Sequence, residues 1–270
     1  IYDRLVAAGA VFGVSAAHEV PLWFAGSPED DPETASFHRS TAFDAVAEEC
    51  RAVREAVGVW ETSSYCKLEI EGPDAQTWLD GVLSNRLPRE PGRVVLSPML
   101  WPSGRILGEV TVARIDPDRF LLFGSPSAES HYLRWLGQRL PPAARISIRS
   151  RTRELCGLSV TGPRSRELLA RVTAADVSDS GLPFLRSRSL IVGLASTLVL
   201  RLSFTGELGY EIYMRADEQR HVFERLWEAG ASLGLRNFGL RALNALRLEK
   251  GYGAWGREYS ADATPDEAGL

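Results

Sequence analysis

The sequence has few of the residues that build metal centres and disulfide frameworks. Its 270 residues include four histidines and three cysteines, Cys50, Cys66 and Cys156. The cysteines are odd in number, far apart and outside any CxxC or Cys/His spacing, which predicts neither a disulfide scaffold nor a zinc site. We therefore expect no metal and a reducing compartment.

Excess positive charge and long apolar runs are also absent. The formal net charge is -4, which argues against a partner bound through nucleic-acid phosphates. No apolar run reaches the length of a membrane span, and the first residues lack the pattern of a secretion signal. We expect a small-molecule partner, and neither nucleic acid nor a membrane.

Common catalytic and phosphate-binding motifs are missing as well. The sequence has no Walker A loop, no H-E-x-x-H helix and no G-x-S-x-G elbow. Residues 251–256, "GYGAWG", match G-x-G-x-x-G, but they follow a predicted helix and precede a polar loop. A dinucleotide site needs a strand before this motif and a helix after it, so we reject that interpretation.

The hydrophobic periodicity that is present predicts an α+β fold with mostly antiparallel strands. The expected helices cover residues 43–59, 74–85, 128–140, 217–233 and 239–251. The expected strands cover residues 65–72, 105–114, 118–124, 196–204 and 209–214. Residues 28–34 form an acidic stretch typical of a surface loop. The order strand, Gly-Pro, helix occurs around both Gly72 and Gly162, which indicates two copies of one βα unit.

A carboxylate flanked by glycines lies in the stretch "FTGELGYEIYM", residues 204–214. Gly206 and Gly209 permit a tight reversal, so the stretch is typical of a hairpin that points Glu207 away from its strands. The ordinary interpretation is a solvated glutamate at a loop tip. The alternative is a binding site, since a carboxylate accepts paired N–H donors from a flat heterocycle and the Tyr210 ring can cover its face.

The helix predicted at 239–251 has apolar residues on two sides, which predicts burial in the middle of the molecule. Asn244 is then buried with it. Because an unpaired buried amide is costly, Asn244 belongs either to a structural network or to a ligand site. Arg247, Glu249 and Lys250 are typical of a surface ion-pair cluster.

Several stretches resemble the folate-binding module of the glycine-cleavage aminomethyltransferase (T-protein) family. They are "VTGP", "FTGELGYEIYM", "GLRALNALRLEKGYGAWG" and "TPDEAGL". The stretch "EECRAVREAVGVWETSSYCKLEIEGPDA" looks more like the C-terminal half of dimethylglycine and sarcosine dehydrogenases. The resemblance covers nearly the whole chain.

The resemblance implies a folate-binding fold of two α+β subdomains around a central opening. The subdomain containing 60–145 is expected to be inserted between, or packed on, segments 1–59 and 146–270. Family members continue into a small C-terminal β-barrel domain, so we expect that domain to be missing from a chain that stops at Leu270.

The resemblance also implies a function. A flavin oxidoreductase domain carrying FAD, in cis or in trans, oxidises an N-methylated glycine to an iminium. This module then captures the carbon on tetrahydrofolate as 5,10-methylenetetrahydrofolate, in the bacterial cytoplasm or the mitochondrial matrix. The residues implied to contact the folate are Glu207, Tyr210, Phe204, Asn244, Trp255 and Met99.

The chain departs from the family pattern at the catalytic acid. Relatives carry an aspartate in the loop that corresponds to residues 99–114, where this chain offers Glu109. A glutamate is one methylene longer, and small errors of position are costly in rate. Arg105 close to Glu109 would keep that carboxylate ionised. Phe204 replaces a tyrosine of relatives, and Leu243 replaces an arginine of the glycine-cleavage branch.

Two alternatives stay open. One is a folate-dependent aminomethyltransferase or demethylase that acts without a flavin partner. The other is a non-catalytic folate-binding module. They differ in whether Glu109 supports turnover.

Overall fold

The computed structural model describes residues 1–26 and 37–270, and the acidic stretch at 28–34 lies outside these residues. The chain divides into two compact units. Unit 1 comprises residues 1–64, 156–184 and 188–252, and unit 2 comprises residues 65–155, 185–187 and 253–270. The chain therefore leaves unit 1 after residue 64, builds most of unit 2, and returns to complete unit 1.

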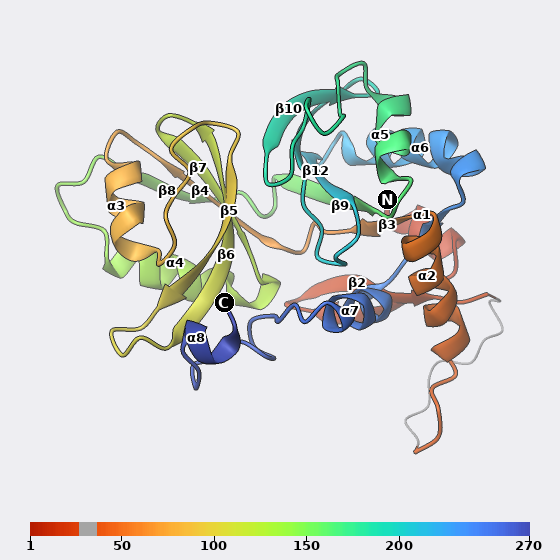
Figure 1. Cartoon of the computed structure of the whole chain (residues 1–270), viewed down its shortest axis with the longest axis horizontal. Coiled ribbons are helices and arrows are strands. Elements are labelled where there is room, and N and C mark those ends of the chain that lie inside the picture. The colour runs from red at the N-terminus through yellow and green to blue at the C-terminus, as the bar shows by residue number, and fades with distance from the viewer. Residues whose placement is uncertain (27–36) are drawn as a thin grey trace. The chain divides into compact units, whose positions relative to one another are not determined.

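Unit 1 is built on a six-stranded sheet with the order β10-β11-β12-β9-β3-β13 (Figure 1). Its strands are β3 (Val57–Glu61), β9 (Leu155–Thr161), β10 (Ser187–Val192), β11 (Ala195–Leu200), β12 (Gly209–Arg215) and β13 (Leu235–Asn237). β3 pairs antiparallel with β9, and β11 with β12, whereas β13 runs parallel to β3. A separate antiparallel hairpin, β1 (Ala10–Ser15) and β2 (His18–Phe24), has no counterpart among the sequence predictions.

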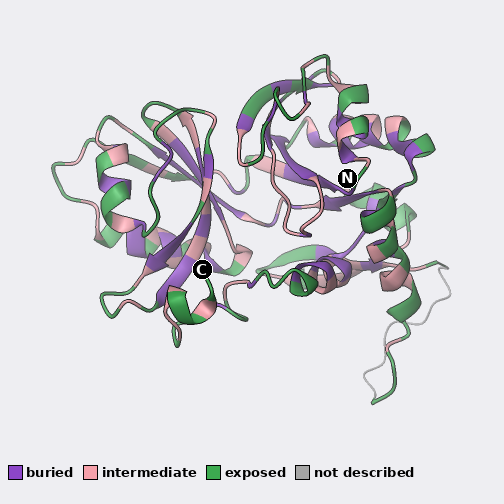
Figure 2. Ribbon diagram, viewed as in Figure 1, coloured by how far each residue is buried: buried purple, intermediate pink, exposed green. Residues whose placement is uncertain are grey.

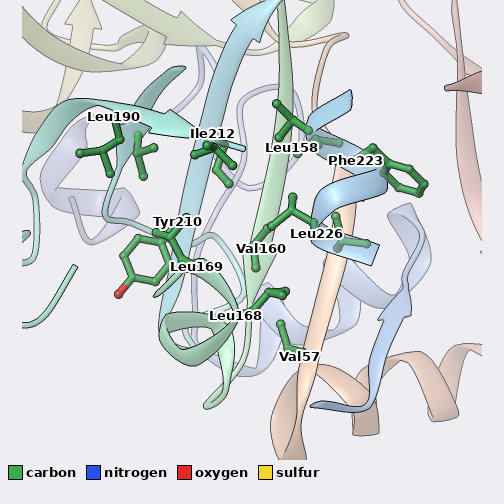
Figure 3. Close-up of a cluster of buried hydrophobic side chains, with 14 of the residues drawn as sticks. Val57, Leu158, Val160, Leu168, Leu169, Leu190, Tyr210, Ile212, Phe223 and Leu226 are labelled. Atoms are coloured by element: carbon green, nitrogen blue, oxygen red, sulfur yellow. The ribbon is translucent and has the colours of Figure 1, made fainter. Parts of the chain in front are cut away.

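The helices of unit 1 bury one side each. They are α1 (Tyr2–Ala7), α2 (Phe43–Glu55), α5 (Ser165–Val172), α6 (Gln219–Gly230) and α7 (Leu240–Glu249), with a short 3-10 turn η2 (Ala231–Leu233) after α6. Leu168 and Leu169 of α5 join Phe223 and Leu226 of α6 in one core with Val160 of β9 (Figure 3). Figure 2 shows that buried residues follow the strands, while these helices also carry exposed residues.

Unit 2 is built on a five-stranded antiparallel sheet with the order β5-β6-β7-β4-β8. Its strands are β4 (Cys66–Glu71), β5 (Val94–Leu100), β6 (Ile106–Asp116), β7 (Arg119–Gly124) and β8 (Ser147–Ser150). Its helices are α3 (Ala75–Val82), α4 (Glu129–Gln138) and α8 (Pro265–Ala268), with a 3-10 turn η1 (Pro126–Ala128). Trp78 of α3 and Trp135 of α4 pack with strand residues in a second core.

These elements confirm the predicted α+β class with mostly antiparallel strands. Two boundary predictions are wrong. The strand expected over 196–204 ends at Leu200, and the helix expected over 43–59 ends at Glu55, after which Val57–Glu61 form β3. Val57 and Val59 are almost fully buried, and β-branched side chains favour a strand that is covered on its faces. A Cβ added at Gly58 would come within 2.6 Å of Val53 and 2.7 Å of Phe238, so the strand needs glycine at this close contact.

The two predicted βα units are both present, one in each unit. β4 is followed by Gly72 and α3, and β9 by Gly162 and α5, so the two copies lie 90 residues apart with helices of eight residues each. Both glycines have positive φ, +147° at Gly72 and +126° at Gly162. An added Cβ would meet the backbone oxygen of Arg145 at 2.0 Å or of Val53 at 2.6 Å. In both copies the glycine of the Gly-Pro pair therefore lies against the backbone of another segment, at a place with no room for a side chain.

A buried carboxylate, Glu49 of α2, joins three segments of unit 1. Its side chain accepts the backbone N–H of Phe24 in β2 at 2.6 Å and that of Gly239, before α7, at 2.8 Å. Glu49 is 4% exposed. Burial raises the pKa of Glu49 to about 7 from the usual 4.5, and the two backbone hydrogen bonds only partly oppose this rise.

We expect the stability of the protein to fall between pH 4.5 and pH 7 because of Glu49. In this window the folded protein holds a proton that the unfolded chain has released, so raising the pH favours unfolding. Across this window the free energy of unfolding should fall by about 3 kcal/mol. Urea unfolding at pH 5 and pH 7.5 measures it. Glu49→Gln should flatten this slope and Glu48→Gln, at the exposed neighbour on the same helix, should keep it; equal slopes in all three proteins would contradict the assignment.

Within residues 1–26 and 37–270, no helix is both long enough and apolar enough to span a membrane.

Candidate functional site

The glycine loop, residues 201–208, joins β11 to β12 and closes the predicted hairpin. Hydroxyl groups hold its base, with Thr205 Oγ1 at 2.7 Å from Thr161 Oγ1 and 2.8 Å from Ser203 Oγ. Thr205 Oγ1 also accepts the backbone N–H of Glu207 at 3.3 Å. The backbone of Glu207 is therefore positioned by a threonine that is 1% exposed.

The side chain of Glu207 is 27% exposed, neither free in solvent nor fully buried. Its Oε1 lies 3.5 Å from Nζ of Lys250, just after α7. The stem of Lys250 covers Gly206, whose φ is +77°, and a Cβ there would come within 2.4 Å of Lys250 Cγ. Gly206 thus allows both the reversal of the chain and the approach of the lysine.

Aromatic side chains lie beside this carboxylate. Phe204 of the glycine loop stacks on Tyr252, with ring centroids 6.4 Å apart and planes 12° apart. The guanidinium carbon of Arg247 lies 5.8 Å from the centre of the Phe204 ring. The glycine loop and the segment after α7 thus meet at two places, Glu207 with Lys250 and Phe204 with Tyr252.

The structure corrects the prediction for α7. Leu248 is 52% exposed and Asn244 only half-buried, so the helix buries one face rather than two. The buried polar residue is Arg247, at 1% exposure, which the sequence interpretation places in a surface cluster. Arg247 donates from Nε to Asn244 Oδ1 at 2.9 Å and from Nη1 to the Tyr252 carbonyl oxygen at 2.8 Å. Its position four residues after Leu243, on the buried face, is the signal that predicts this burial.

Tyr210 does not lie where the sequence interpretation expects it, with its ring over the face of a bound heterocycle. Tyr210 is fully buried in the core of unit 1 (Figure 3). Its hydroxyl accepts Nε–H of Arg166 at 3.2 Å and donates to the carbonyl oxygen of Val177 at 3.4 Å. Since β12 turns this side chain into the core, its ring has no exposed face for a flat ligand.

A second acid of the same motif is Glu211, which the sequence interpretation passes over. It is 8% exposed, and its Oε2 accepts the hydroxyl of Tyr213 at 2.6 Å. The two residues are two positions apart on β12 and therefore share one face of the strand. That alternation is the signal for this buried polar pair.

In unit 2, Glu109 of β6 and Trp255 come together. The backbone N–H of Trp255 donates to Oε1 of Glu109 at 3.3 Å. Residues 253–270 return to the sheet here, since the backbone N–H of Ile106 donates to the carbonyl oxygen of Ala263 at 2.9 Å. Trp255 also packs against the core of this unit. The structure thus joins two of the predicted site residues through a hydrogen bond that orients the carboxylate.

Met99 and Arg105, two further residues singled out from the sequence, also lie in unit 2. Met99 is fully buried in the core, so it presents no surface to a ligand. Arg105 lies against the segment after Trp255, where its Nη1 donates to the carbonyl oxygen of Asp262 at 3.3 Å. Its charge is also one cause of the lowered pKa of Glu267, after hydrogen bonds from Thr264. Arg105 therefore contacts residues 262–267, and its expected effect on Glu109 stays a prediction.

Comparison with known proteins identifies the family. A family model described as the GCVT N-terminal domain matches residues 1–270. Human dimethylglycine dehydrogenase, a mitochondrial protein, is 37% identical over 271 residues, which cover 100% of this chain and 31% of that protein. The aminomethyltransferase of Bacillus subtilis is 31% identical over 229 residues, covering 84% of this chain and 62% of that protein.

A solved structure agrees in fold. The glycine cleavage system aminomethyltransferase T from Bartonella henselae matches with a TM-score of 0.78 and 24% identity, over 98% of this chain and 65% of that one. The chain spans about a third of the length of the mammalian relative. These matches confirm the resemblance drawn from the sequence, and the chain belongs to the GCVT N-terminal domain family, whose matching relatives include aminomethyltransferases and dimethylglycine dehydrogenases.

Proposed function

We propose that this module binds tetrahydrofolate and captures, as 5,10-methylenetetrahydrofolate, the carbon released when an N-methylated glycine is oxidised. Membership of the GCVT N-terminal domain family supports one-carbon transfer. Likeness to dimethylglycine dehydrogenase supports a methylated glycine as the source of the carbon. The same likeness supports a flavin oxidoreductase domain carrying FAD, in cis or in trans, as the partner.

Glu207 is the observation that carries the proposal. A pterin presents neighbouring N–H donors along one edge, and a carboxylate matches such a pair. The 3.5 Å separation between Glu207 and Lys250 is longer than the ~2.7–2.9 Å of a well-formed charge-assisted hydrogen bond, so both carboxylate oxygens keep acceptor capacity. Phe204 and Tyr252 add an aromatic surface to the same loop. These residues fit a reduced pteridine.

Glu109 supplies the negative charge of the reaction. Trp255 holds Oε1 of this carboxylate through a backbone N–H, which fixes the position of the negative charge beside the sheet of unit 2. A fixed carboxylate stabilises a cationic iminium without any reorganisation during the reaction. When bound, tetrahydrofolate would supply two nucleophilic nitrogens, N5 and N10, for two new bonds to the iminium carbon; the carbon–nitrogen double bond of the iminium would break, and the two protons of N5 and N10 would go to the released amine.

Calorimetric titration of the protein tests the binding step. We expect tetrahydrofolate to bind about 100-fold more tightly than p-aminobenzoylglutamate, which lacks the pterin, because only the complete ligand brings N–H donors to Glu207. The two ligands share the rest of their structure, so the difference reports on the pterin alone. Equal affinities, or no heat from either ligand, would contradict the proposed function.

A further inference from the structure

The backbone of Glu109 is held by a tyrosine of unit 2 that the proposed chemistry does not use. The hydroxyl of Tyr132, on α4, donates to the carbonyl oxygen of Glu109 at 3.2 Å and accepts its backbone N–H at 3.3 Å. A hydroxyl group has one donor and two acceptor positions, so one oxygen can serve both groups. Tyr132 is fully buried.

The place of Glu109 in the sheet lets Tyr132 reach its backbone. On one side it lies opposite Pro98 of β5, which has no N–H and whose carbonyl oxygen accepts from Ser84 instead. On the other side the last β6–β7 pair is Val110 with Gly124. Glu109 therefore lies one residue beyond the end of that ladder, and the Tyr132 hydroxyl contacts its backbone there.

The ring of Tyr132 fits against β6 and β7 at two glycines. A Cβ added at Gly108 would come within 2.4 Å of the ring, and one added at Gly124 within 2.8 Å. After Gly124 the chain leaves the sheet to form η1 and α4. Tyr132 of α4 then places its hydroxyl beside the backbone of Glu109. The absence of side chains at Gly108 and Gly124 thus makes room for the Tyr132 ring beside the Glu109 backbone.

We propose that Tyr132 is a positioning residue for Glu109, acting as a clamp that fixes the β6 backbone from which the catalytic carboxylate projects. This inference rests on the proposed function of Glu109. With Trp255 holding the carboxylate and Tyr132 holding the main chain, Glu109 is fixed at both ends. A side chain that is one methylene longer than aspartate gains most from such restraint, because its extra torsion otherwise spreads the carboxylate over several positions.

Tyr132→Phe tests the clamp, since it removes the hydroxyl and keeps the ring. We expect hydrogen exchange at the Glu109 amide, followed by NMR in the whole chain, to rise about tenfold. We expect kcat for tetrahydrofolate-dependent capture of the carbon to fall by about 10- to 100-fold. The dissociation constant for tetrahydrofolate should stay within about twofold, since Glu207 and Phe204 are unchanged.

Thr197→Val is the matched control. Thr197 is 3% exposed, and its hydroxyl donates to the carbonyl oxygen of Leu190 at 2.9 Å in unit 1, so this variant also loses one buried hydroxyl. It should change neither Glu109 exchange nor kcat. The proposal would be overturned if the Glu109 amide of the Tyr132→Phe variant exchanged at the wild-type rate. It would also be overturned if exchange became faster while kcat stayed at the wild-type value. A wild-type protein that binds no tetrahydrofolate contradicts the proposed function instead, and the exchange comparison needs no folate.

Discussion

Replacing Glu207 by glutamine is expected to weaken tetrahydrofolate binding by about 100-fold. The carboxylate offers two acceptor oxygens to the pterin edge, whereas a glutamine offers one acceptor and turns an N–H₂ donor toward a second donor. The loop itself should keep its conformation, because Thr205 holds the backbone N–H of residue 207 and Gly206 retains its φ of +77°. Calorimetric titration of the variant beside wild type measures the change.

Two controls separate ligand recognition from the loss of an ion pair. Lys250→Met removes the cation that contacts Glu207, and an exposed pair of this kind contributes ~1 kcal/mol at most, so binding should change less than about fivefold. Glu228→Gln removes an exposed carboxylate of α6, 62% exposed and paired with Arg225, and should have no effect. If Lys250→Met weakened binding as strongly as Glu207→Gln, loss of the ion pair, and not loss of contacts with the ligand, would explain the effect of Glu207→Gln.

Replacing Glu109 by glutamine is expected to lower the rate of methylene capture by about 100-fold while tetrahydrofolate binding stays intact. Glutamine keeps an oxygen that accepts the Trp255 N–H, so the side chain keeps its place and loses its charge. The measurement is the yield of 5,10-methylenetetrahydrofolate relative to free formaldehyde, with a flavin oxidoreductase supplied to oxidise N-methylglycine.

Glu90→Gln provides the control for this loss of charge. Glu90 is 69% exposed and pairs with Arg186 in the same unit, so its variant should behave as wild type. Full methylene yield in Glu109→Gln would favour the non-catalytic folate-binding module over the proposed transferase. Capture from a methylated amine without any flavin would favour the free-standing demethylase.

Local features of the chain were predictable because they depend on neighbours in sequence. The βα units at Gly72 and Gly162 follow from strand alternation, a Gly-Pro turn and a helical repeat, and both are present. The hairpin around Gly206 was equally predictable, because positive φ at a glycine is a local requirement. The β1–β2 hairpin escaped prediction, because its strands have weak alternation and form a two-stranded sheet of their own among the described residues.

The environment of each site residue depended on partners remote in the chain. Tyr210 was predicted beside a ligand, yet its hydroxyl is held by Arg166 and Val177, more than thirty residues away. Arg247 was assigned to the surface, yet the glycine loop covers it through Phe204. The helical pattern of α7 predicts that Arg247 is buried, but no pattern within one element predicts which remote residues Arg247 and Tyr210 contact.

The order of amino acids alone therefore predicted the fold class and the family, which are confirmed, and it proposed the two acids, Glu207 and Glu109, because motifs and periodicity act over a few residues. Folding decided which neighbours these acids have: Lys250 and an aromatic pair for Glu207, and Trp255 and Tyr132 for Glu109. The physical reason is that hydrogen bonds and burial depend on distance in space, and the chain brings residues up to 146 positions apart into contact at Glu109.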